Sequence, residues 1–371
     1  MSALANLLNS PGASLEAAGD WDAVNQLVRD KGWSDGLPVV PPTAERVEAM
    51  LGYCDRPWDK PVGAIPPRYG EATPLRLAAN AVMAGCRPEY FPVIVATIEA
   101  MCEEKFNLYG IQATTHPVAP LLIVNGPIAK ELGINAGHNA LGPGVQANAT
   151  IGRAIRLALV NVGGAIPGSG DMSTFGSPAK YTYCVAENEE RNPWEPLHVE
   201  LGFAREASTV TVIGAETPHN VNDHESLSGE GLLRMIAGTI GETGANDIYY
   251  EGQPLVIFGP EHAEQVAADG YSKADVKKYF YENGRFPLGR LSHENIERRM
   301  RVKFPERFAK AGLDALVPLA QRPEDFLVIV LGGAGKHSAF VPTFGATRAV
   351  TRALKRSDGS LAGSINDLRR R

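Results

Sequence analysis

The chain has 371 residues, of which 44% are apolar and 21% are charged, as in a globular protein with a sizeable buried core. A formal net charge of −6 provides no basic field for a phosphate backbone, so we do not expect a nucleic-acid partner. No apolar run reaches the roughly 18 residues of a membrane span, and no secretory signal is recognised, which predicts a cytoplasmic protein without a membrane partner.

The first 60 residues predict a helical N-terminal arm followed by a proline-rich wrap, WSDGLPVVPPT. A short helix is expected over 43–52, which opens with threonine and ends with glycine. Apolar residues at helical spacing predict buried helices over 72–86 and 88–104. Cys86 ends the first of them, and we interpret it as a small buried hydrophobe, with a thiolate as the alternative. The four cysteines form no CxxC pair, so reduced thiols are expected.

Two strand-like runs resemble each other. Residues 119–134 (APLLIVNGPIAKELGI) align with residues 253–268 (QPLVIFGPEHAEQVAA) except for one extra position, Asn125, which suggests an internal duplication. Both runs pass from an apolar strand into Gly-Pro, and proline suits the first turn of a helix. Together with 39 glycines and 27 prolines, this pattern predicts a multi-layer α/β fold with short, mainly parallel or mixed strands that lead into glycine-rich loops. We predict a first α/β half over 61–205, a second over 206–354 and a flexible tail over 355–371.

Two further runs, 208–224 and 325–340, also pass from an apolar strand into a polar loop. Ligands of open α/β sheets bind beyond the carboxyl ends of the strands. We therefore expect His219, His262 and His337 to share one cavity with His116 and to transfer protons there, while Lys336 neutralises a carboxylate. The alternative is that Gly-Pro makes tight packed turns, that the histidines are ordinary loop residues, and that His262 caps its own helix.

Other polar side chains are candidates for catalysis or for substrate binding. The stretch before the first strand is dense in hydrogen-bonding groups, which are costly to bury unless a substrate or a neighbouring loop pairs with them. In the acidic stretch 184–203, we favour a solvated surface for Glu189 and Glu190 and an acid or base role for Glu187. The catalytic candidates are His116, Glu187, His219, Lys336 and His337, and the substrate-binding candidates are Asn107, Gln112, Thr114, Asn148, His198 and His262.

Two glycine-rich loops are either anion-binding loops or simple turns. The first, 137–153, precedes an apolar helix and places Asn148 near its cap. The second, 162–181, carries the reactive side chains Asp171, Ser173, Thr174 and Lys180.

A divalent metal is the alternative cofactor. His219, Asp223 and His224 are residue types that bind zinc, iron or manganese, although their spacing matches no ligand motif. No GxGxxG fingerprint is present, and LGGAGKHS departs from a phosphate-binding P-loop at two positions. No nicotinamide or flavin site is therefore expected.

Six stretches resemble a largely uncharacterised bacterial family that is often encoded beside, or fused to, small proteins with a Cys/Sec-Gly-Ser-Cys motif, the UGSC family. These are WSDGLPVVPPT, NAVMAGCRPEY, GIQATTHPVAPLLIVNGPI, NATIGRAIRLALVNVGGA, ENEERNPWEPLHVELGF and GGAGKHSAF. The resemblance covers nearly the whole chain from about Trp33 to Thr351. The small protein resembles the selenocysteine-bearing segment of glycine and proline reductases. Because this chain contains no Cys-Gly-Ser-Cys, the resemblance implies that any such nucleophile comes from a partner protein.

The leading hypothesis is an enzyme subunit that cleaves or forms a C–N, C–O or other C–heteroatom bond in a small polar or carboxylated metabolite. It would use acid/base chemistry, as a lyase or hydrolase, or as the substrate-binding subunit of a two-component reductase with a thiol- or selenol-bearing partner. A metal-dependent hydrolase or hydro-lyase is the second alternative. A non-catalytic binding or scaffold subunit is the third, although only 7% of the residues are aromatic. A homo-oligomer is expected.

Overall fold

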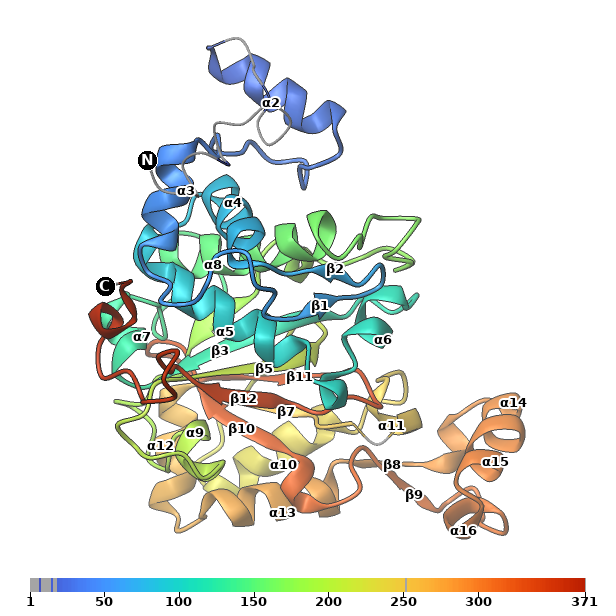
Figure 1. Cartoon of the computed structure of the whole chain (residues 1–371). Helices are drawn as coiled ribbons and strands as arrows, with labels where there is room; N and C mark the ends of the chain where they lie inside the picture. The colour runs from blue at the N-terminus through green and yellow to red at the C-terminus, as the bar shows by residue number, and fades with distance from the viewer. Residues whose placement is uncertain (1–6, 8–14, 16–18, 251, 371) are drawn as a thin grey trace.

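The computed structural model describes residues 7, 15, 19–250 and 252–370 (Figure 1). Its centre is formed by two four-stranded sheets of mixed strand direction, which confirms the predicted α/β fold class. The first sheet has the order β12 (Val350–Ala353), β5 (Thr209–Ala215), β3 (Ala119–Asn125) and β4 (Cys184–Ala186). The second has the order β6 (His219–Asn222), β11 (His337–Val341), β7 (Leu255–Phe258) and β10 (Leu327–Val330).

The central strands are apolar on both faces because both faces are covered. Alternate residues such as Leu121 and Ile123 of β3 pack against Leu255 and Ile257 of β7 in a layer between the two sheets. The intervening residues, such as Leu122, face outward into helices. Since successive side chains of a strand point to opposite faces, a continuous apolar run is what a strand buried on both sides requires. The result is a stack of helices, sheet, sheet and helices, which Figure 1 shows edge-on.

Helices cover the outer face of each sheet (Figure 1). The first sheet is covered by α5 (Phe91–Met101) and α8 (Gln146–Asn161), on which α4 (Pro74–Ala84) packs, with α3 (Ala44–Leu51) packed on α4 in turn. The second is covered by α10 (Gly229–Ile240), α12 (Pro260–Ala268) and α13 (Lys273–Asn283). The predicted helices over 72–86 and 88–104 correspond to α4 and α5. Thr73 accepts a hydrogen bond from Arg76 N at the start of α4, and Gly85 ends that helix with φ 87°, which favours glycine.

The remaining elements are short. They are α2 (Trp21–Asp30), β1 (Ala64–Ile65), β2 (Gly70–Glu71), α6 (Leu108–Ala113), α7 (Pro127–Glu131), α9 (Leu197–Glu200), α11 (Asp247–Tyr250), β8 (Arg285–Pro287), α14 (His293–Asn295), the π-helix η5 (Ile296–Met300), α15 (Arg301–Lys303), α16 (Pro305–Phe308) and β9 (Leu316–Pro318). Single 3₁₀ turns are η1 (Pro88–Tyr90), η2 (Glu104–Phe106), η3 (Pro178–Lys180), η4 (Leu288–Arg290), η6 (Pro323–Asp325) and η7 (Ile365–Leu368). Across the described residues, helices capable of spanning a membrane are absent.

The two sheets share one topology. β3 is parallel to β4 and antiparallel to β5, and β7 is likewise parallel to β10 and antiparallel to β11. The strand that follows β5, β6, pairs with β11 in the second sheet, and the strand that follows β11, β12, pairs with β5 in the first. Each half therefore completes the other's sheet. The predicted boundary after residue 205 cuts through the first sheet, because β5 and β12 belong to it. The internal duplication stays a prediction.

The C-terminal segment differs from the flexible tail that we predicted over 355–371. Ala362, Ile365 and Leu368 are buried in the core of the first half, and Ile365 N donates to Glu131 Oε2 at 2.9 Å. We predicted a flexible tail because the segment contains many charged residues. Its three apolar residues, three positions apart, are nevertheless buried, and their burial holds the segment in place.

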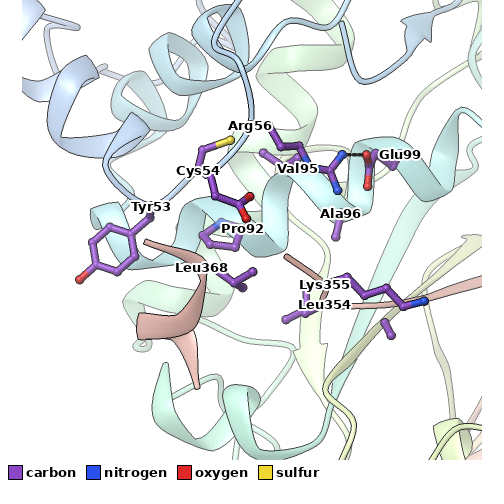
Figure 2. Close-up of a pocket in the computed structure, with 12 residues that line it drawn as sticks. Tyr53, Cys54, Arg56, Pro92, Val95, Ala96, Glu99, Leu354, Lys355 and Leu368 are labelled. Atoms are coloured by element: carbon purple, nitrogen blue, oxygen red, sulfur yellow. Dashed lines mark hydrogen bonds and ion pairs between the residues drawn. The ribbon is translucent and has the colours of Figure 1, made fainter. Parts of the chain in front are cut away.

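A small pocket separates this segment from α5. Figure 2 shows Leu368 near Pro92 and Tyr53, with the ion pair between Arg56 and Glu99 on the other side. The pocket has a volume of only about 30 Å³, close to the share of one water molecule in the liquid, so it has no room for a metabolite.

Candidate active site

Four strand ends meet at one edge of the molecule, which we call the carboxyl edge. Asn188, two residues beyond β4, donates from its backbone N to Val330 O at the end of β10, at 2.8 Å. Gly332 N in turn donates to Ala136 O, in the segment that follows α7, at 2.9 Å. The ends of β3, β4, β7 and β10 therefore lie together, on the side of Figure 1 where α7, α9 and α12 lie.

A cavity of about 440 Å³ opens at this edge. Its walls come from the loop 139–142, from β6, β7 and β11, and from the glycine-rich loop after β10. Asn139, Asn220 and His337 supply polar side chains among apolar neighbours such as Ile257 and Leu331. A largely apolar cavity with a few polar groups is typical of a small-molecule site.

Ser338 and His262 form a buried hydrogen-bonded pair on the face of β11 opposite to the one that carries His337 and lines this cavity. The Ser338 Oγ lies 2.8 Å from Nδ1 of His262, and Nε2 of the same ring lies 3.0 Å from the backbone oxygen of Asp223. A carbonyl oxygen can only accept, so Nε2 carries the proton and donates, and Nδ1 accepts from the serine hydroxyl. His262 is 1% exposed, and burial lowers its pKa below the ordinary value of 6.5. The imidazole is therefore neutral at neutral pH, with Nδ1 ready to take a proton.

The position of His262 excludes the alternative that it caps its own helix. Gly259 precedes α12, and no side chain caps that end. The neighbouring Glu261 instead reaches across the edge and accepts from Gly335 N at 2.8 Å, which fixes the glycine-rich loop.

His337 lines the same cavity and is exposed, and Lys336 precedes it in the chain. Nδ1 of His337 lies 3.1 Å from Asn220 Oδ1, and the His224 ring stands edge-on to the His337 ring with centroids 5.2 Å apart. Lys336 Nζ donates to the His224 backbone oxygen at 3.1 Å, and this is its one hydrogen bond to a described residue. An ammonium has three donors, so two remain for an anionic ligand.

His138 joins this group, although the sequence analysis did not select it. A Cβ on Gly333 would lie 2.1 Å from Nδ1 of His138, so the histidine ring occupies the space that the glycine leaves open. His138 and His224 therefore lie beside the glycine-rich loop and His337, whereas His262 lies on the other face of β11.

Two predicted members, His116 and His219, do not reach the carboxyl edge. His116 precedes β3, and its Nε2 lies 2.6 Å from Oε1 of Glu216, just beyond β5. Because Thr343, just beyond the end of β11, bridges Ala215, this pair is separated from His337 by the extended segment from 337 to 343, roughly 20 Å at about 3.3 Å per residue.

His219 is on the wrong face of the sheet for the cavity. It pairs with Phe340, three positions along β11 from His337, so its side chain points to the opposite face. The His219 side chain is 59% exposed and lies 3.7 Å from Glu242. The expectation of one cavity for four histidines is therefore wrong for His116 and His219, and β11 separates His262 from the cavity.

The three metal candidates are not brought together. The carboxylate of Asp223 accepts from the backbone N atoms of Glu225 and Ser226 and from the Ser226 hydroxyl, which closes a local turn. His219 faces away and His224 stacks on His337. Within the described ranges, no group of three or more His, Cys, Asp or Glu side chains is arranged to hold a metal ion.

Glu187, Asn148 and His198 lie inside the protein, where they hold loops in place. Glu187 is 4% exposed and accepts from the side-chain amides of Asn125 and Asn192 and from Leu197 N, so it organises the loop between β4 and β5. Its pKa is raised by burial, against Lys273 and these donors. The Asn148 amide joins three backbone oxygens, and Nε2 of the fully buried His198 lies 3.2 Å from Arg205 O.

The candidates before β3 also act locally. Asn107 caps α6 by accepting from Gly110 N, and Thr114 accepts from His116 N. Gln112 is 2% exposed, and its Nε2 has no partner among the described residues. None of the three lines the cavity at the carboxyl edge.

The cysteines are poor nucleophiles as they stand. Burial raises the pKa of the Cys86 thiol to about 12 and that of Cys102 to about 11, and it also raises the pKa values of Cys54 and Cys184. This favours the interpretation of Cys86 as a buried hydrophobe over a thiolate, since the thiolate is the nucleophilic form.

Comparisons of this chain with models of protein families, with curated proteins and with solved structures gave no match. The resemblance to the UGSC-associated family therefore stays a prediction.

Proposed function

We propose that the chain is an enzyme that cleaves or forms a C–O or C–N bond in a small carboxylated metabolite, by acid/base chemistry in the cavity at the carboxyl edge. The observation that carries the proposal is His337, which lines the cavity with its ring held by Asn220 and with Lys336 beside it in the chain. An imidazole oriented by a second side chain is a common way to position an acid or a base.

The buried pair behind His337 supports the site. The Ser338 hydroxyl donates to Nδ1 of His262, and Nε2 of that ring donates to the Asp223 carbonyl, so the start of β11 is tied to α12 and to the loop after β6. A proton-transfer group such as His337, once held in position, contributes roughly 10²- to 10⁴-fold to a rate.

Lys336 and His337 complete the chemistry. The Lys336 ammonium binds the carboxylate of the metabolite, since its one hydrogen bond leaves two donors. Nδ1 of His337 is held by Asn220, while its Nε2 has no partner among the described residues and transfers a proton to the leaving oxygen or nitrogen.

The raised pKa values of the cysteines bear on the two-component alternative. If the reaction uses a thiolate, a partner with a Cys-Gly-Ser-Cys motif is the better source than this chain. Co-purification with such a protein, followed by assays of each component alone, tests this version. The cytoplasmic location and the homo-oligomeric state also stay predictions.

The test uses a defined panel of small hydroxy acids, amino acids and their amides, incubated with the protein in D₂O and followed by ¹H NMR. We expect loss of substrate protons or new product signals. The rate should fall about 100-fold or more in His337→Gln, whereas Asn220→Ala, which removes only the hydrogen bond that orients His337, should retain part of it. Lys336→Met should mainly raise KM, because it removes a contact to the carboxylate.

A matched control and a substrate-free measurement accompany the panel. His219→Gln changes an exposed histidine outside the cavity, so its rate should equal that of the parent. The ¹⁵N shifts of His262 should show a proton on Nε2 and none on Nδ1. A His337→Gln variant with the full rate would refute the role proposed for this cavity, and the opposite tautomer of His262 would refute the hydrogen-bond directions of the buried pair.

A further inference from the structure

A second and larger cavity, of about 840 Å³, lies between α8, the loop 167–181 and the N-terminal wrap. It shares no lining residue with the cavity at the carboxyl edge. Ser34 and Asp35 of the wrap form one wall, and Arg156 of α8 forms another. This is the glycine-rich loop that the sequence left open as an anion site or a simple turn.

Two cations and one carboxylate meet at the base of this cavity. Asp171 Oδ2 accepts from Arg156 Nη2 at 2.8 Å, and Lys180 Nζ lies 2.7 Å from both carboxylate oxygens. The three side chains are 12%, 5% and 11% exposed for Arg156, Asp171 and Lys180, respectively. Buried charges are normally paired, and here one carboxylate faces two cations, so one positive charge is left over.

The other acidic residue of the lining does not cancel this charge. Asp35 is bound by Arg153, whose Nε and Nη2 lie 2.7 and 2.9 Å from the two carboxylate oxygens. Arg153 does not line the cavity, so the negative charge of Asp35 is balanced by a side chain outside the cavity. The excess positive charge therefore remains on Arg156 and Lys180.

Several donors of this base remain for a ligand. Nη2 is the only nitrogen of the Arg156 side chain with a hydrogen-bond partner among the described residues, although a guanidinium has five N–H groups. The Ser177 hydroxyl is buried at the cavity and also has no partner in the described part of the chain. Buried polar groups normally find partners, so these donors indicate a missing acceptor.

The mouth of the cavity is apolar and aromatic. The Phe175 residue is 83% exposed and Tyr181 is 50% exposed, and both line the cavity. A large apolar side chain that is this exposed contributes little to the stability of the fold, but it can pack against the carbon portion of a bound molecule.

We propose that this cavity binds a carboxylate with an apolar or aromatic body, whose carboxylate contacts Arg156 and Lys180 and whose body lies against Phe175 and Tyr181. A single negative charge matches the single positive charge left at the base. The site is separate from the carboxyl edge, so it does not depend on the function proposed there.

The test compares two probes of the same shape, 4-fluorobenzoate and 4-fluorobenzamide, by ¹⁹F NMR titration of the full chain. The benzoate should bind at least about tenfold more tightly than the amide, because only the benzoate carries the charge. Lys180→Met should weaken benzoate binding about tenfold and leave Arg156 paired with Asp171, while Lys180→Arg should restore it. Phe175→Ser changes an exposed side chain, so the variant should fold, and it should weaken both probes.

Lys130→Met serves as the control, since Lys130 is an exposed lysine of α7 that pairs with Glu190 outside this cavity. Its affinity for benzoate should equal that of the parent. Equal affinities for the two probes, no binding of benzoate at millimolar concentration, or full affinity in both Lys180→Met and Phe175→Ser would overturn the proposal. Inorganic phosphate that binds as tightly as benzoate would overturn the role of the apolar wall.

Discussion

Asp247 provides the sharpest test of the electrostatics of this fold. The residue begins α11 and is fully buried, and its carboxyl group lies 2.9 Å from Thr343 N and 2.5 Å from the Thr343 hydroxyl. Burial raises the pKa of Asp247 to about 7, against the two Thr343 donors, and the negative charge of Glu216 raises it further. Asp247→Asn removes the titration and keeps the size of the side chain.

The sign of the effect follows from proton linkage. The folded chain keeps the Asp247 proton up to about pH 7, whereas the unfolded chain loses it near 3.8. Protonation therefore stabilises the fold fully below the unfolded value, and this stabilisation is lost as the pH rises to about 7. At about 1.4 kcal/mol for each pH unit, the whole effect is on the order of 4 kcal/mol.

The assay is urea unfolding of the parent and of Asp247→Asn at pH 5, 6, 7 and 8. The free energy of unfolding of the parent, relative to the variant, should fall by about 1.4 kcal/mol per unit between pH 5 and 7 and level off above that. Glu216→Gln is the matched variant, because it removes the negative charge that raises the pKa of Asp247. In this variant the free energy of unfolding should level off at a lower pH than in the parent. A difference between parent and variant that stays constant within about 0.5 kcal/mol from pH 5 to 7 would refute the reasoning.

Three further predictions concern packing and titration. Gly126→Ala should destabilise the fold by several kcal/mol, because Gly126 has φ 85° and a Cβ there would lie 2.4 Å from Ala207 O. Gly133→Ala, at φ 65° with open space around the Cβ, should lower the stability by only about 1 kcal/mol. Thermal unfolding of the two variants measures this difference. Leu368→Ala should cost about 2–4 kcal/mol if the C-terminal segment is packed, and a loss near zero in denaturant unfolding would contradict that packing. Because the pKa of His262 is lowered in the fold, the unfolded chain binds more protons below pH 6.5, so stability should fall on acidification, with a smaller fall in His262→Gln.

Local chemistry makes much of the fold predictable. Thr73 and Pro74 mark the start of α4 and Gly85 marks its end, so the helix over 72–86 follows from signals within a few residues. The runs LLIV and LVIF are apolar at every position because both faces of their strands are covered. The neighbours Lys336 and His337 were placed at a strand end for the same local reason.

Strand direction is where local signals fail. We treated the loops after all four apolar runs as parts of one edge, but β5 runs antiparallel to β3, so its end lies at the opposite edge. This places Glu216 beside His116 and takes His219 away from His337. Ser338 was missed because its partner, His262, is 76 residues away, and nothing near it in sequence indicates that pairing.

By itself, the sequence determined where helices and strands form, that the protein is of the α/β class, and that histidines and a lysine follow strands of the second half, since each of these depends on neighbours along the chain. Tertiary structure alone decided which strand ends share an edge, which histidines face a cavity, and that Arg156, Asp171 and Lys180 meet at the base of another. The physical reason is that direction in a sheet, and the side of it that a residue faces, are set by pairing between segments far apart in the chain.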